Sequence, residues 1–92
     1  MKTLLECREI INDIDPKMQE LFISRMQTVK DVALYKMIHD LPIFDEKREA
    51  EIIERLSKDV PEELKAYYIE FIKAVMHISK EYQKTIIDRN KK

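Results

Sequence analysis

Residues 25–36 read RMQTVKDVALYK, and this stretch decides how the chain folds. On a helix that turns ~100° per residue, eleven residues return a side chain to within about 20° of its starting direction. Arg25 and Lys36 therefore point the same way. That direction is apolar, because Arg25 falls within a series of apolar residues spaced seven apart. The series is Leu4, Ile11, Met18 and Val32. Two cations are thus predicted to face the interior of the fold.

Charges in an interior need partners. A buried and unpaired charge costs several kcal/mol even after the surroundings relax, so each cation must meet a carboxylate. An internal salt bridge would satisfy Arg25 or Lys36 alone. Two cations on one face call for more negative charge in the same place, and a ligand that carries carboxylates would supply it. Both interpretations are open at this point.

The composition indicates one all-helical domain spanning residues 1–92. Gly is absent and Pro occurs only three times, while helix-forming Leu, Ile, Glu and Lys are prominent. Seventeen Lys and Arg against eighteen Asp and Glu give a net charge of −1, which argues against a nucleic-acid partner.

The cellular setting is predicted from what the sequence lacks. Cys7 is the only cysteine, so no disulfide can form within the chain, and no familiar zinc-binding spacing joins it to His39 and His77. No run of eighteen apolar residues and no signal-peptide pattern occurs, so we expect no membrane segment and a cytoplasmic protein.

The first predicted helix covers about residues 3–39. Thr3 followed by Glu6 is a capping-box pattern, and apolar residues then recur every three or four positions to about His39. Pro16 should kink this helix without ending it, because the apolar phase is the same on both sides. A rod of this length cannot be covered by the rest of one chain, so its apolar face predicts association with a second copy.

Two further helices are predicted, a short one over about residues 45–58 and a long one over about residues 61–88. Asp45 suits the cap of the short helix. Pro61 suits the first turn of the long helix, and Ser79 and Gln83 lie one turn apart on its apolar stripe. No strand or domain linker is indicated.

Each polar candidate has an ordinary structural interpretation when it is taken alone. Ser79 could be a packed small residue, Gln83 an edge residue and Asp45 only a cap. Arg48 and Glu49, in the first turn after Asp45, could be solvated. The candidates gain weight as a set.

Arg8 raises a question of distance. It precedes Arg25 by seventeen residues, which on a straight helix separates the two by ~25 Å. One small ligand cannot span that separation. If Arg8 joins the same site, a partner subunit must supply it.

Taken together, these residues resemble the all-helical class of chorismate mutases. The segments that carry the resemblance are LLECREIINDID (4–15), SRMQTVKDVALYK (24–36), LPIFDEKRE (41–49) and SKEYQ (79–83). The shared pattern is an early Arg, then an Arg and a Lys eleven apart, an Asp with Arg-Glu three and four residues on, and a Ser and a Gln four apart. The similarity extends from about Leu4 to Gln83.

The resemblance implies an intertwined homodimer of three-helix chains that rearranges chorismate to prephenate without a cofactor. Arg8 from the partner chain and Arg25 would bind the substrate carboxylates. Lys36 and Gln83 would donate hydrogen bonds to the ether oxygen, and Glu49 would hold the ring hydroxyl. The remaining polar lining would come from Asp45, Arg48 and Ser79.

Two alternatives remain beside this interpretation. Isochorismate pyruvate lyases share the architecture and bind a similar dianion, although Asp45, Arg48, Glu49 and Gln83 together favour the mutase. A non-enzymatic helical dimerisation module would explain the heptad-like spacing of the first helix. Such a module has no need for Arg25 and Lys36 on the apolar face.

Overall fold

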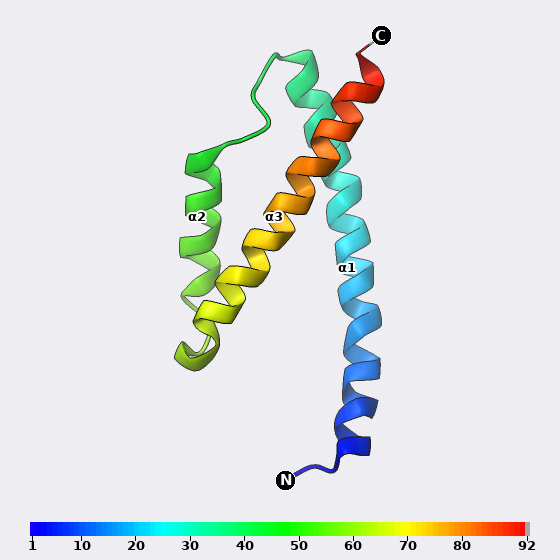
Figure 1. The fold of residues 1–92 in the computed structure, drawn as a ribbon, viewed down its shortest axis with the longest axis vertical. Helices are drawn as coiled ribbons and strands as arrows, with labels where there is room; N and C mark the ends of the chain where they lie inside the picture. Colours follow the sequence, from blue (N-terminus) through cyan, green and yellow to red (C-terminus); the bar gives the residue numbers. More distant parts are fainter. Residues whose placement is uncertain (92) are drawn as a thin grey trace.

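The computed structural model describes residues 1–91, which form three helices and no strand: α1 (Leu4–Ile38), α2 (Glu46–Ser57) and α3 (Glu62–Asn90) (Figure 1). The predicted all-α class with long, short and long helices is confirmed. The third helix begins one residue later than expected and continues two residues further.

The N-terminus of α1 is fixed by the predicted capping box. The Thr3 hydroxyl accepts a hydrogen bond from the Glu6 amide at 3.2 Å, and the Glu6 carboxylate accepts one from the Thr3 amide at 3.4 Å. The helix then runs through Pro16 without interruption. Figure 1 shows its two halves close to one line, as the common apolar phase predicts.

The C-terminus of α1 closes in a motif that usually contains glycine. Asp40 adopts the left-handed conformation, with φ of 54°. The Leu41 amide donates to the Lys36 carbonyl at 2.8 Å and the Asp40 amide to the Met37 carbonyl at 3.4 Å. These two bonds form a Schellman motif, in which a non-glycine residue bears some backbone strain. The motif fixes the backbone of Lys36 where the chain turns toward α2.

The other two helices begin at a cap and at a proline. Asp45 caps α2 by accepting from the Arg48 amide at 3.0 Å, as predicted. Pro61 precedes the first residue of α3 and accepts from the Leu64 amide at 2.9 Å. Among the described residues, the backbone contacts between helices are those of α3 with α1 and with α2. In Figure 1, α3 accordingly crosses between the other two.

The chain forms a thin and elongated layer. Its Cα atoms extend over 56 × 25 × 14 Å. The radius of gyration is 16.7 Å, against about 12 Å for a compact domain of this length. This elongated shape leaves little room for a core, and among residues 1–91 seven are buried: Val29, Ala33, Ile72, Met76, Ser79, Gln83 and Ile86.

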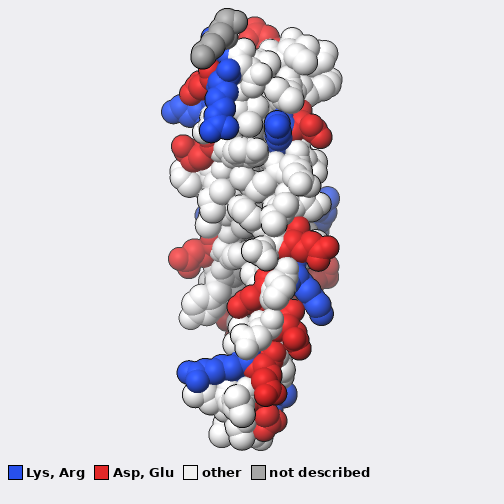
Figure 2. Space-filling model, turned by 90° about the vertical axis from the view of Figure 1, so that its right-hand side faces the viewer, with Lys and Arg blue, Asp and Glu red and all other residues white. Residues whose placement is uncertain are grey.

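The apolar face of α1 is largely uncovered within the single chain. Leu21 is 70% exposed, and the seven-residue series of Leu4, Ile11, Met18 and Val32 is exposed throughout. Figure 1 shows the N-terminal end of α1 projecting past the other helices, and α3 diverging from α1 toward that end. Viewed from the α1 side, the molecule presents a long uncharged surface with acidic side chains toward one end (Figure 2). None of the helices in residues 1–91 has the length and apolar content needed to cross a membrane.

Candidate functional site

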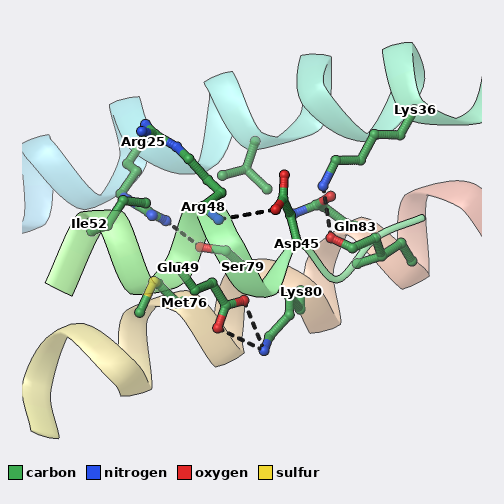
Figure 3. A pocket seen from close by; sticks show the side chains of 12 residues that line it. Arg25, Lys36, Asp45, Arg48, Glu49, Ile52, Met76, Ser79, Lys80 and Gln83 are labelled. Atoms are coloured by element: carbon green, nitrogen blue, oxygen red, sulfur yellow. Dashed lines mark hydrogen bonds and ion pairs between the residues drawn. The ribbon is translucent and has the colours of Figure 1, made fainter. Parts of the chain in front are cut away.

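A hollow lies between the three helices, and the segment that joins α1 to α2 contributes to its lining (Figure 3). Its empty volume is about 470 Å³, including the solvent space at its open side. The lining consists of Arg25, Val29, Lys36, Ile43, Asp45, Arg48, Glu49, Ile52, Met76, Ser79, Lys80 and Gln83. Seven of the eight residues predicted for the site are among them.

The two α1 cations point into this hollow, as the eleven-residue spacing predicts (Figure 3). The Arg25 guanidinium donates to the Ser79 hydroxyl, which in turn donates to the Val75 carbonyl at 2.8 Å. The Lys36 ammonium donates to the Ile43 carbonyl at 2.7 Å. Both cations are half-buried, and both are held by neutral oxygens.

Neither cation forms the internal salt bridge that was one of the two initial interpretations. Within residues 1–91 the ion pairs are Lys65 with Glu62 and Lys80 with Glu49. No carboxylate of the described chain therefore neutralises Arg25 or Lys36. Half-buried cations without a carboxylate partner suit an anionic ligand, which would offset their partial loss of hydration.

The first turn of α2 brings three of the predicted residues to the hollow. Asp45 uses one carboxylate oxygen to cap the helix, and this bond fixes the turn that carries Arg48 and Glu49. Asp45 and Arg48 are exposed, whereas Glu49 is half-buried. The alternative that Glu49 is merely solvated is wrong, since it makes an ion pair across to α3.

The last helix contributes the two most buried polar residues. Ser79 is 3% exposed and Gln83 is 6% exposed, so both belong to the interior face of α3, as predicted. The Gln83 amide oxygen is buried and has no hydrogen-bond partner in the described residues. A buried polar atom without a partner is unusual in a folded protein. Rotation of the amide by 180° would present its NH₂ group at the same place.

Lys80 lines the hollow and was not predicted. Its ammonium lies 3.0 and 3.3 Å from the two oxygens of Glu49 and 4.6 Å from the centre of the Phe44 ring. A lysine beside the apolar stripe of α3 reads as a solvated residue, and thirty-one positions separate it from Glu49. The available signal was its place in SKEYQ between Ser79 and Gln83, which are both inward-facing.

Arg8 is the one predicted residue that the single chain does not bring to the hollow. It is exposed, near the start of α1, and is absent from the lining. Because α1 is continuous between Arg8 and Arg25, their separation along the helix stays at ~25 Å. Within one chain, Arg8 cannot reach the ligand that Arg25 would bind.

The charge of the lining indicates what kind of molecule it can hold. The lining contains four cationic and two anionic side chains. The cations are Arg25, Lys36, Arg48 and Lys80, and the carboxylates are Asp45 and Glu49. The lining therefore carries a net positive charge of two at neutral pH, which suits a small dianion. Arginine can grip a carboxylate through two parallel hydrogen bonds, and lysine acts as a point charge.

Comparison with known families gives this geometry a context. The family model for chorismate mutase type II matches residues 7–84. The chain belongs to this family. A search of curated proteins and a search of solved structures returned no match. The segment that matches the chorismate mutase type II model includes every predicted site residue, from Arg8 to Gln83.

Proposed function

We propose that this protein is a chorismate mutase that converts chorismate to prephenate, on the route to phenylalanine and tyrosine, and that it acts in the cytoplasm. The observation that carries the proposal is the pair of half-buried cations, Arg25 and Lys36, that face one hollow without a carboxylate partner. Membership of the type II chorismate mutase family supports it. Chorismate carries two carboxylates, which match the net charge of the lining.

The reaction determines what such a site must do. The rearrangement of chorismate breaks one C–O bond and forms one C–C bond within a single molecule. No proton is transferred and no nucleophile is activated. Catalysis must come from binding the compact reactive conformer and from stabilising the negative charge that develops on the ether oxygen. Fixed cations and hydrogen-bond donors in a hollow are suited to both tasks.

Two residues are assigned to the ether oxygen. The Lys36 ammonium has three N–H groups, and the bond to the Ile43 carbonyl occupies one of them. The Gln83 side chain ends in a buried amide whose oxygen has no partner among the described residues. With the amide rotated by 180°, its NH₂ group takes the place of this oxygen and donates to the substrate. Both donors come from rigid helices, which favours a preorganised site.

The remaining roles follow from placement. Arg25 binds a substrate carboxylate, and Ser79 orients its guanidinium. Glu49 accepts a hydrogen bond from the ring hydroxyl. Asp45 orders the first turn of α2 and presents Arg48 at the rim.

The second carboxylate is assigned to Arg8 of the partner subunit in a homodimer. The apolar face of α1 is exposed along its N-terminal half, and a second copy of the chain would bury it. Docking α1 against a second copy would cover this face and carry Arg8 toward the open side of the other hollow. Each dimer would then contain two equivalent sites with residues from both chains.

Turnover of chorismate tests the proposal. Purified protein without added cofactor should remove chorismate absorbance near neutral pH, with saturation, and the product should be prephenate. Arg25→Ala should abolish the activity, while Arg89→Ala, an exposed arginine at the end of α3, should retain it. A folded protein that leaves chorismate unchanged would refute the mutase. Release of pyruvate from isochorismate by that protein would identify the lyase instead.

A further inference from the structure

We infer that Lys80 is a positioning residue that holds the Glu49 carboxylate in place to accept the ring hydroxyl of the substrate. The inference rests on the proposed function, because it concerns the orientation of a residue assigned to substrate binding. Lys80 is not among the eight residues that were predicted for the site. This role also explains why, within residues 1–91, the only ion pair in the hollow joins Lys80 and Glu49.

The Lys80 ammonium contacts both carboxylate oxygens of Glu49 and so restricts the orientation of that carboxylate. The Lys80 ammonium lies 3.0 Å from one oxygen of Glu49 and 3.3 Å from the other. The two side chains are 28% and 24% exposed, so water screens the pair less than it screens a surface ion pair. Because Lys80 is on α3 and Glu49 on α2, the contact also fixes one wall of the hollow relative to the other.

A second contact fixes Lys80 itself. Its ammonium lies 4.6 Å from the centre of the Phe44 ring, within the range of a cation–π interaction. The cation is thus held between a ring and a carboxylate. An ammonium engaged on both sides is poorly placed to bind substrate directly, so Lys80 acts through Glu49.

The composition of the hollow explains why Glu49 needs a dedicated partner. Arg25, Lys36 and Arg48 line the same hollow and have no ion pair in the described residues. A carboxylate released from Lys80 would be attracted to one of them. That pairing would remove a hydrogen-bond acceptor from the ring hydroxyl and a cation from the substrate carboxylates. Lys80 keeps the substrate-binding cations free by engaging Glu49 elsewhere, and Figure 3 shows the Glu49 carboxylate directed toward Lys80.

A double-mutant cycle tests this role. Lys80→Met, Glu49→Gln and the double variant are compared by kcat/KM for chorismate, with Lys80→Arg as the conservative variant. Lys84→Met is the matched control, because Lys84 is an exposed lysine one turn further along α3 and lies outside the lining. Circular dichroism and thermal melting show which variants are folded. If Lys80→Met unfolds, Lys80→Gln replaces it in the cycle.

We expect Lys80→Met to lower kcat/KM about tenfold, a coupling within the range measured for contacting residues. Lys80→Arg should stay within about threefold of wild type, and Lys84→Met should match wild type. In the Glu49→Gln background, Lys80→Met should change kcat/KM by less than about twofold, since its partner is already gone.

Equal losses in both backgrounds, in a wild-type protein that converts chorismate, would overturn the inference and leave the proposed function intact. A loss in Lys80→Arg as large as in Lys80→Met would also overturn it. A wild-type protein that does not convert chorismate would overturn the proposed function, and the inference with it.

Discussion

Replacing Lys36 by alanine removes the one ammonium that the proposal directs at the ether oxygen. Loss of a donor of this kind lowers turnover by about 10²–10³-fold, or roughly 2.7–4 kcal/mol of transition-state stabilisation. Lys36 also donates to the Ile43 carbonyl at 2.7 Å and so joins α1 to the segment before α2. That part-buried carbonyl can rebind water, so the cost to folding is about 1 kcal/mol.

The two effects separate in experiment. A cost of about 1 kcal/mol lowers the Tm of a domain of this size by about 4–8 °C, and such a variant stays folded at 25 °C. We therefore expect a loss of turnover of about 10²–10³-fold with only a modest fall in Tm. Lys30→Ala is the matched control, because Lys30 is an exposed lysine on α1 outside the hollow, and it should match wild type in both measurements.

Steady-state kinetics with chorismate and thermal melting by circular dichroism supply these values. Turnover of Lys36→Ala within a factor of three of wild type would refute the donation to the ether oxygen. A raised KM with unchanged kcat would refute it in another way, because the cation would then bind substrate and transition state equally.

Three further predictions concern the donor, the helix end and the apolar face. Gln83→Glu should be most active at low pH and lose activity as pH rises, because only a protonated carboxyl can donate to the ether oxygen; a flat pH profile of kcat/KM would contradict this. Asp40→Gly should raise the free energy of unfolding by about 0.5 kcal/mol and leave kcat/KM unchanged, because glycine adopts φ of 54° without strain; urea denaturation measures it, and a destabilised variant would be the contrary result. Leu21→Glu places a charge on a residue that is 70% exposed in the single chain and should produce monomers in analytical ultracentrifugation; a stable dimer would show that this face is not the interface.

Much of the fold follows from local signals in the sequence. The Thr3 and Glu6 capping box, the Asp45 cap and the position of Pro61 lie at the three helix starts. Continuity through Pro16 follows from the apolar phase on either side of it. These signals depend on neighbours within one or two turns, and such interactions can be recognised without knowing the tertiary structure.

Burial was harder to predict, because periodicity identifies an apolar face without saying which chain covers it. Val29 and Ala33 are buried, whereas the seven-residue series that includes Met18 and Val32 is exposed in the single chain. The spacing of residues 25–36 correctly directed both cations to one hollow. It could not exclude an internal salt bridge, since that depends on where the carboxylates of α2 lie.

Lys80 shows why the site could be predicted only in part. Its contacts with Glu49 and Phe44 join segments that are distant in the sequence, and they depend on how α2 packs against α3. The place of Lys80 between Ser79 and Gln83 puts it near the site, but it does not indicate which side chains Lys80 contacts. Ser79 and Gln83 were recognisable because each interrupts an apolar stripe.

In the proposed homodimer, each chorismate site combines the hollow of one chain with Arg8 of the other. Complementation between two inactive variants tests it most directly. When Arg8→Ala and Arg25→Ala chains are denatured together in equal amounts and refolded, half of the dimers should contain both chains. Each mixed dimer has one complete site, so the mixture should regain about a quarter of wild-type turnover. A mixture no more active than the better of the two variants alone would contradict a site shared between the two chains.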